Sequence, residues 1–263
     1  MSLVLLTYPT LSRHAAEITH FCSTRSGGHS IGLYESLNLG EFTQDNPSAI
    51  AQNRALLAKA LGILPTQLYF AHQTHGTAVK LVDSTLSKLS LTDRKQQLEG
   101  YDALISNTPN LCLTVTTADC VPILLYDSKH KAIAAIHSGW KSTLENIVEK
   151  TLITMQEQFG TKANELVVSI GPCIGKEVYE VGDELYTAFK DKNFAVDQLF
   201  ESTTNGKHLF DIRQAVFLQL TKAGVSDIIH SPYCTYTDEA LFFSARRQGA
   251  NSGRMLSGIM IRE

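Results

Sequence analysis

Hydrophobic and polar positions alternate along the chain in two ways. Short apolar runs bounded by polar, Gly or Pro residues are typical of strands, and apolar residues spaced three or four apart are typical of helices. Residues 121–127 and 131–137 are apolar runs on either side of the polar stretch SKHK, so they predict two connected strands. Other strands are predicted at residues 3–8, 68–83 (two fragments around His75–Gly76), 111–117, 165–171, 227–235 and at the end of the tail.

Helical spacing and capping residues predict helices at residues 46–63, 142–160, 181–191 and 211–224. Asn46 can cap the first of these, and Pro47 suits its first turn. Ser142 is the predicted cap of the second, with Glu145 three residues on and Gly160 at its end.

The order of these elements indicates the fold class. Strands and helices alternate, but several strands follow one another directly. This order favours an α/β fold in which mixed β-sheets form a sandwich flanked by helices. Residues 23–42 are rich in Gly and Ser and are predicted to be a loop. No linker or low-complexity tract divides the sequence, so residues 1–263 are predicted to form one domain.

Composition and charge narrow the expected partners. The chain is 43% hydrophobic and 19% charged, which is ordinary for a globular protein. Its net charge is -3 and it has no Lys/Arg run, so nucleic acid is not an expected partner. No stretch approaches about 18 apolar residues, and the N-terminus lacks the features of a signal peptide, so a membrane is not expected either. The five widely spaced cysteines fit a reducing cytosol and predict a cytoplasmic protein.

Three side chains near strand ends are candidates for chemistry. His75 precedes Gly76, Cys120 lies between two predicted strands, and His137 closes a strand. Their separations of 45 and 17 residues are too wide for a local zinc finger but allow three strand ends to meet in one cleft. Three such ligands with an open fourth position suit a catalytic Zn²⁺. The alternative is a nucleophile–base pair formed by Cys120 and His137.

Ten segments in order, from about Phe21 to Ile261, resemble the laccase-domain family. They are STRSGGHS, SLNLG, NRALL, QTHG, TADCVPILL, HSGWK, IGPCIG, YEVG, YCTYTDEALFFSARRQG and SGRM. That family is also catalogued as multicopper polyphenol oxidase, purine nucleoside phosphorylase and peptidoglycan editing factor. The resemblance implies a single-domain α/β protein with one catalytic Zn²⁺. Its ligands then fall on His75 of QTHG, Cys120 of TADC and His137 of HSGW.

The resemblance also implies an activity, and the chemistry of that activity suggests further site residues. Family members are reported to phosphorolyse adenosine, inosine, guanosine and methylthioadenosine and to deaminate adenosine. Asp119 is the nearest candidate for an acid/base, or it orients a ligand. Arg25 and Arg54 are candidates to bind phosphate, and Arg54 could instead form a buried ion pair. The remaining candidates are Asn38, for ribose or base or as a turn cap, and Arg246, for base or phosphate.

The leading prediction is therefore a zinc-dependent purine nucleoside phosphorylase with adenosine deaminase activity, whose partners are purine nucleosides and phosphate. Copper is the less expected metal, because a multicopper centre needs about ten His ligands. Two alternatives stay open. One is an oxidoreductase, acting with copper on phenols or on a cell-wall precursor. The other is a non-catalytic, metal-stabilised module that acts through partners. His72 is predicted to be a flanking or core residue that does not bind metal, and to face away from His75 because their offset on a strand is odd.

Overall fold

Three β-sheets and the helices around them make up the molecule. The computed structural model describes residues 3–263, so Met1 and Ser2 of the predicted domain lie outside the described residues. The strands are β1 Leu5–Leu6, β2 Ile18–Ser23, β3 Leu68–Phe70, β4 Val79–Leu81, β5 Ala103–Ser106, β6 Cys112–Thr117, β7 Val121–Asp127, β8 Ala132–Ser138, β9 Leu166–Ile170, β10 Glu180–Gly182, β11 Phe200–Ser202, β12 Lys207–Phe210, β13 Asp227–His230 and β14 Met255–Ile261. The helices are α1 Pro9–Ser12, α2 Pro47–Leu61, α3 Ser84–Ser87, α4 Leu91–Gln97, α5 Trp140–Leu144, α6 Ile147–Phe159, α7 Asp183–Asp191, α8 Val196–Leu199, α9 Ile212–Lys222 and α10 Ala245–Gln248.

Two of the sheets are mixed. The five-stranded sheet has the order β1-β2-β14-β6-β3, and the six-stranded sheet has the order β13-β9-β7-β8-β5-β4. The pairs β3–β6, β4–β5 and β9–β13 are parallel, and the other pairs of these sheets are antiparallel. The third sheet, β10-β12-β11, is antiparallel. The predicted α/β fold with mixed sheets flanked by helices is confirmed.

Burial on both faces explains why the central strands read as nearly continuous apolar runs. On β7, Val121, Ile123 and Leu125 pack with the helices α5, α6 and α9. Leu124 and Tyr126 point to the opposite face and pack with the five-stranded sheet. Because successive side chains of a strand alternate, one run supplies both layers.

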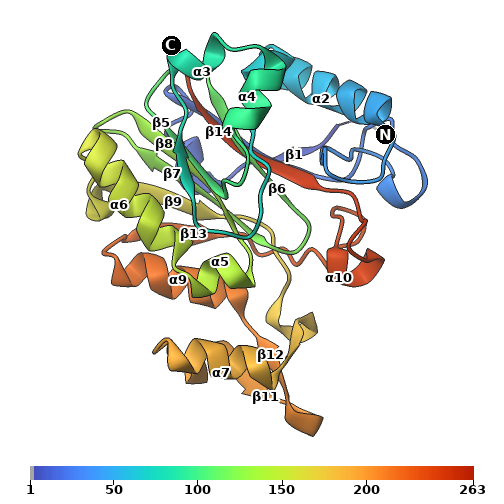
Figure 1. The fold of residues 1–263 in the computed structure, drawn as a ribbon, viewed down its shortest axis with the longest axis vertical. Coiled ribbons are helices and arrows are strands. Elements are labelled where there is room, and N and C mark those ends of the chain that lie inside the picture. Colours follow the sequence, from blue (N-terminus) through green and yellow to red (C-terminus); the bar gives the residue numbers. More distant parts are fainter. Residues whose placement is uncertain (1–2) are drawn as a thin grey trace.

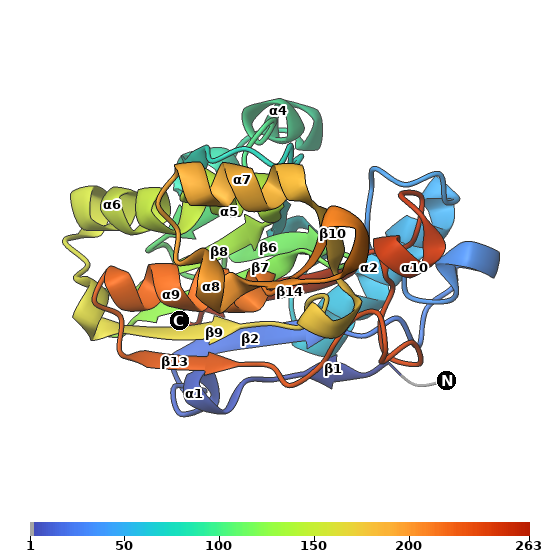
Figure 2. The ribbon, with the colours of Figure 1, turned by 90° about the horizontal axis from the view of Figure 1, so that it is seen from below.

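The helices cover the outer faces of the two large sheets. Figure 1 shows α2 on one side of the sheets and α6 and α9 on the other, in agreement with the hydrophobic clusters that these helices share with the strands. Figure 1 shows α7 beside β11 and β12 at one end of the molecule, and Figure 2 is seen from that end. None of the helices in residues 3–263 combines the length and hydropathy needed to cross a bilayer.

The predicted helix at residues 142–160 is in fact two helices. The first, α5, begins at Trp140, and the hydroxyl of Ser142 accepts a hydrogen bond from the Gly139 N–H instead of capping a helix that starts after it. Asn146 then adopts a left-handed φ of 58° and separates α5 from α6. The single helix and its Ser142 cap were wrong, whereas Gly160 does end α6, with a φ of 76°.

The first long helix agrees with its prediction. The side chain of Asn46 accepts a hydrogen bond from the Ser48 N–H, and Pro47 is the first residue of α2. The sequence patterns did not identify β2, β5, β10–β12, α3 and α4. Most of these elements span only three or four residues, so their periodicity is weak.

Candidate metal centre

Three separate segments bring His75, Cys120 and His137 together. His75 follows β3, Cys120 lies in the connection from β6 to β7, and His137 is near the end of β8. Since β7 and β8 are antiparallel with Val121 opposite Ser138, their register places Cys120 beside the end of β8. One possible ligand atom from each of the three residues lies within 4.8 Å of the other two.

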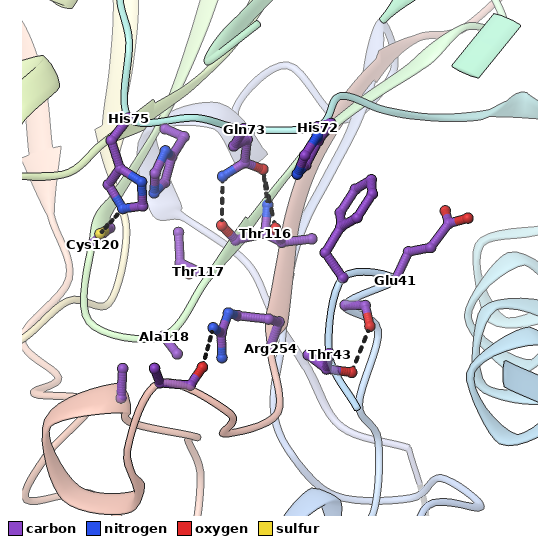
Figure 3. A pocket seen from close by; sticks show the side chains of 15 residues that line it. Glu41, Thr43, His72, Gln73, His75, Thr116, Thr117, Ala118, Cys120 and Arg254 are labelled. Atoms are coloured by element: carbon purple, nitrogen blue, oxygen red, sulfur yellow. Dashed lines mark hydrogen bonds between the residues drawn. The ribbon is translucent and has the colours of Figure 1, made fainter. Parts of the chain in front are cut away.

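The geometry of this cluster suits a metal ion. Nε2 of His75 lies 3.7 Å from Sγ of Cys120, and the rings of His75 and His137 lie 4.9 Å apart at 77° to each other. Figure 3 shows His75 and Cys120 pointing toward one another. A donor set of two imidazoles and one thiolate, with a position left for water or substrate, is of the type that Zn²⁺ uses in catalytic sites.

Gly139, directly after β8, leaves room for the cluster. A Cβ atom at this position would lie 2.6 Å from Cδ2 of His75 and 3.1 Å from Sγ of Cys120. Real Cβ atoms do not approach other heavy atoms so closely, so any larger residue would displace His75. The Gly in HSGW is therefore a requirement of the site.

Asp102 holds two of the three predicted ligands and was not identified from the sequence. Its carboxylate is buried and lies 2.7 Å from Nδ1 of His137, which leaves Nε2 of that ring for a metal. The same carboxylate accepts the backbone N–H groups of Thr74, His75 and Gly76 at 3.1, 3.0 and 2.8 Å. It thereby stabilises His75 in a left-handed conformation with a φ of 59°. The signal in the sequence that could have identified Asp102 is an acidic residue directly before the apolar run ALIS.

The electrostatics of the cluster favour a thiolate. Burial by itself would raise the pKa of Cys120, but the charge and hydrogen bonds of His137 and His75 lower that pKa to about 6. Burial would likewise lower the pKa of His137, but Cys120 and Asp102 outweigh it and raise the pKa. The thiolate is the form of cysteine that binds metals. Cys120 is thus available as a thiolate ligand near neutral pH, whereas His137 would have to lose a proton to bind a metal.

Asp119 positions the loop that carries Cys120. It has a φ of 94°, and its two carboxylate oxygens accept hydrogen bonds from the hydroxyls of Thr235 and Ser244 at 2.6 and 3.0 Å and from the N–H of Arg246 at 2.7 Å. These bonds connect the Cys120 loop to the C-terminal segment. This arrangement suits a positioning residue, and the acid/base role of Asp119 stays a prediction.

The cluster opens into a cavity of about 380 Å³, here called the metal cavity. This volume is in the range of small-molecule sites. The lining residues are Gly40, Glu41, Phe42, Thr43, His72, Gln73, His75, Thr116, Thr117, Ala118, Cys120, His137, Ala245, Ala250 and Arg254. Of these, Phe42, Gln73 and Arg254 were not singled out from the sequence.

His72 lines the metal cavity together with His75. The prediction that the two rings face opposite sides was wrong, because β3 ends at Phe70 and strand alternation does not continue through residues 71–75. His72 is not part of the three-residue cluster, and its Nδ1 instead lies 2.5 Å from Oε1 of Glu99.

Arg54, Arg25 and Asn38 do not line the metal cavity. Arg54 binds Glu41 at 3.0 Å and the carbonyl of Leu39, which is an ion-pair arrangement, although both side chains are partly exposed. Arg25 donates to the carbonyls of Glu35 and Glu239. Asn38 is fully buried and hydrogen-bonds within its own loop and to the Arg254 N–H. Their predicted roles in binding substrate stay predictions.

Arg246, by contrast, lines a cavity that Cys120 also lines. It lines a second cavity of about 290 Å³, here called the side cavity, which shares Ala118, Cys120, Ala245 and Ala250 with the metal cavity. Its side chain is exposed, and it donates one bond to the carbonyl of Glu180. Arg254 lines the metal cavity (Figure 3) and donates to the carbonyls of Ala250, Ser252 and Gly253. Each of the two cavities that share Cys120 is therefore lined by one arginine.

Known proteins are similar to this chain over nearly its whole length. A family described as multi-copper polyphenol oxidoreductase laccase matches residues 19–262. The chain is 41% identical to a protein of Bacteroides thetaiotaomicron named purine nucleoside phosphorylase, over 98% of this chain and 96% of the relative. It is 34% identical to a protein of an unknown prokaryotic organism named adenosine deaminase RL5, over 91% and 92% of the two chains.

Solved structures have the same fold. The crystal structure of a hypothetical protein YfiH from Bacillus licheniformis superposes with a TM-score of 0.90 at 28% identity, covering 99% of this chain and 97% of that one. Together with the family match, this similarity shows that the chain belongs to the multi-copper polyphenol oxidoreductase laccase family, as the ten sequence segments predicted.

Proposed function

We propose that this chain is a zinc-dependent purine nucleoside phosphorylase that acts on adenosine, inosine, guanosine and methylthioadenosine and also deaminates adenosine. The observation that carries the proposal is the His75–Cys120–His137 cluster at one end of a cavity of nucleoside size. The relatives named purine nucleoside phosphorylase and adenosine deaminase support the same chemistry.

Zinc is the metal that fits this donor set best. Two imidazoles and a thiolate are borderline to soft ligands, and three protein ligands with one open position are typical of catalytic zinc. When bound, the ion would polarise a substrate group and lower the pKa of a bound water. Among the described residues, the second group of possible ligands is Asp127, His130 and Glu165, in which His130 already pairs with Asp127.

The residues of the chain would hold the substrates around this centre. Asp102 orients His137 and the backbone at His75, and Asp119 fixes the loop of Cys120. Phosphorolysis needs cationic groups for phosphate, since guanidinium binds phosphate through two parallel hydrogen bonds. Arg246 in the side cavity is the predicted residue that the geometry favours for this role, because it borders the same cavity as Cys120.

Oxidation of phenols with copper is the second candidate, because the family description names it. The described residues argue against it. Each of the two groups of possible ligands offers three residues, and together they contain three histidines, whereas a multicopper centre needs about ten.

The cytoplasmic location predicted from the cysteines remains a prediction.

One pair of assays separates the two candidates. Zinc-loaded protein is incubated with inosine in the presence and absence of phosphate, and copper-loaded protein with a phenol and oxygen. We expect phosphate-dependent release of hypoxanthine and no significant oxidation of the phenol. Oxidation of the phenol without base release would reject the proposal in favour of the oxidoreductase.

A further inference from the structure

Phe42 presents an exposed aromatic ring to the metal cavity. Its exposed fraction is 64%, although large apolar side chains are usually buried. The loop around it is firmly held. Thr43 donates to the Gly40 carbonyl and accepts a bond from the Asn38 amide, and the adjacent Glu41 is paired with two cationic side chains. The exposure of Phe42 is therefore a feature of a fixed loop.

The imidazole of His72 packs against one face of the Phe42 ring. The rings of Phe42 and His72 are stacked, with centroids 3.8 Å apart and planes 28° apart. Glu99 lies 2.5 Å from Nδ1 of His72 and fixes the orientation of the imidazole. Two separate segments of the chain thus build one aromatic pair: polar bonds hold the loop that carries Phe42, and Glu99 from a third segment fixes the imidazole of His72.

The pair forms a wall of the metal cavity. A further cavity of about 490 Å³, here called the outer cavity, is lined by Phe70, Lys95, Gln96 and Glu99 and by the three residues Glu41, Phe42 and His72 that also line the metal cavity. The Phe42–His72 pair therefore separates the two spaces. Figure 3 shows His72 and Glu41 at the side of the metal cavity away from Cys120.

The chemistry of this wall differs from that of the rest of the metal cavity. Apart from the proposed metal ligands His75 and His137, the only aromatic rings that line it among residues 3–263 are those of Phe42 and His72. Exposed aromatic rings bind the flat π-face of a nucleobase by stacking, whatever the identity of the base. A wall opposite the metal cluster would hold the base while the rest of the nucleoside occupies the cavity.

We propose that the Phe42–His72 pair is the surface on which the nucleobase stacks, and that Phe42 determines the specificity of the site for flat heteroaromatic substrates. This inference rests on the proposed nucleoside chemistry. It predicts that Phe42 contributes to binding of the nucleoside and contributes nothing to binding of phosphate, which has no π-face.

The test measures phosphorolysis by the zinc-loaded wild type and by Phe42→Ala, first varying inosine and then varying phosphate. We expect the KM for inosine to rise about 5- to 150-fold, the range found when a stacking aromatic is replaced by alanine. The KM for phosphate should stay unchanged. Phe42→Tyr keeps the ring and should stay near the wild type. Leu64→Ala removes a side chain that is 65% exposed but does not line the metal cavity, and serves as the matched control.

Calorimetric binding of free adenine to the same proteins separates this inference from the proposed function. Weaker adenine binding by Phe42→Ala, with normal binding by Leu64→Ala, supports the stacking wall even if the wild type cleaves no nucleoside. Equal adenine binding by wild type and Phe42→Ala, or an equal rise of the two KM values, overturns it. Failure of the wild type to release base with phosphate, despite normal adenine binding, rejects the proposed function alone.

Discussion

Oδ1 of Asp102 lies 2.7 Å from Nδ1 of His137, and this contact connects the buried end of β8 to the loop that carries His75. A histidine that binds a metal through one ring nitrogen is usually oriented by a carboxylate on the other. Asp102 meets this requirement for His137 and also stabilises the left-handed backbone at His75. One carboxylate thus preorganises two ligands from separate segments.

Asp102→Ala should destabilise the protein and weaken metal binding. The substitution removes the acceptor of the Thr74, His75 and Gly76 N–H groups and leaves the charged His137 without its partner. Removing one partner of a buried pair costs about 3–5 kcal/mol. Chemical denaturation of the metal-free proteins measures this loss. A variant as stable as the wild type would show that the carboxylate does not organise the site.

The contribution of Asp102 should depend on pH in a defined direction. Its carboxyl is buried, which would raise the pKa, but the bonds to His137 and to the backbone N–H groups lower it overall. A carboxyl with a lowered pKa stabilises the fold above its unfolded value of about 4, and the stabilisation is lost as pH falls through the folded pKa. The stability difference between wild type and Asp102→Asn should therefore be larger at pH 7 than below pH 4. An unchanged difference would contradict the pKa shift.

Cys120 should be the most reactive thiol of the metal-free protein. Its pKa is lowered to about 6, chiefly by His137 against the opposing effect of burial, whereas burial raises the pKa of Cys22 and Cys173 to about 11 and that of Cys112 to about 12. At pH 7 iodoacetamide should modify Cys120 first, with a rate that falls below pH 6, and zinc should protect it. Peptide mass mapping identifies the modified residue. Uniform modification of all cysteines would contradict the lowered pKa of Cys120.

Gly139→Ala should displace His75 and lower zinc affinity, because the new Cβ would lie 2.6 Å from Cδ2 of that ring. The matched control is Gly76→Ala. Its Cβ would meet nothing closer than 3.5 Å, and alanine keeps the N–H bond to Asp102. Competition with a chromophoric chelator measures both affinities. If the two variants bind zinc equally well, close packing at Gly139 is not required.

Arg246→Ala and Arg54→Ala should affect different properties. Loss of a guanidinium–phosphate contact costs about 1.5–3 kcal/mol, so Arg246→Ala should raise the KM for phosphate about 10- to 150-fold and leave deamination nearly unchanged. Arg54 is paired with Glu41, so its replacement should lower the thermal midpoint and reduce both activities together. A selective loss of phosphate use in Arg54→Ala would instead support its predicted role in binding phosphate.

The sequence allowed the fold class and the three clustered residues to be predicted for a physical reason. Strands buried on both faces need continuous apolar runs, and β7 and β8 show them, so Cys120 and His137 could be placed at strand ends. Their convergence with His75 depends on the order of strands in two sheets, which periodicity does not specify. That convergence was predicted instead from the sequence motifs that resemble the laccase-domain family.

The supporting residues could not be predicted in the same way. Asp102 lies 27 residues from His75 and 35 from His137, and only the pairing of β5 with β8 brings it to them. Arg54 occurs in a motif, yet the direction in which its side chain points depends on where Glu41 and the Leu39 carbonyl lie in the folded chain. The odd offset between His72 and His75 was misleading because their segment is not a strand.

Zinc content measured together with phosphate-dependent base release tests the central claim most directly. The proteins to compare are the wild type, Cys120→Ala and, as a matched control that loses a buried thiol elsewhere, Cys112→Ala. We predict about one zinc ion per chain and hypoxanthine release from inosine in the wild type and Cys112→Ala, and loss of both in Cys120→Ala. A Cys120→Ala protein that keeps its full zinc content and full activity would contradict the account.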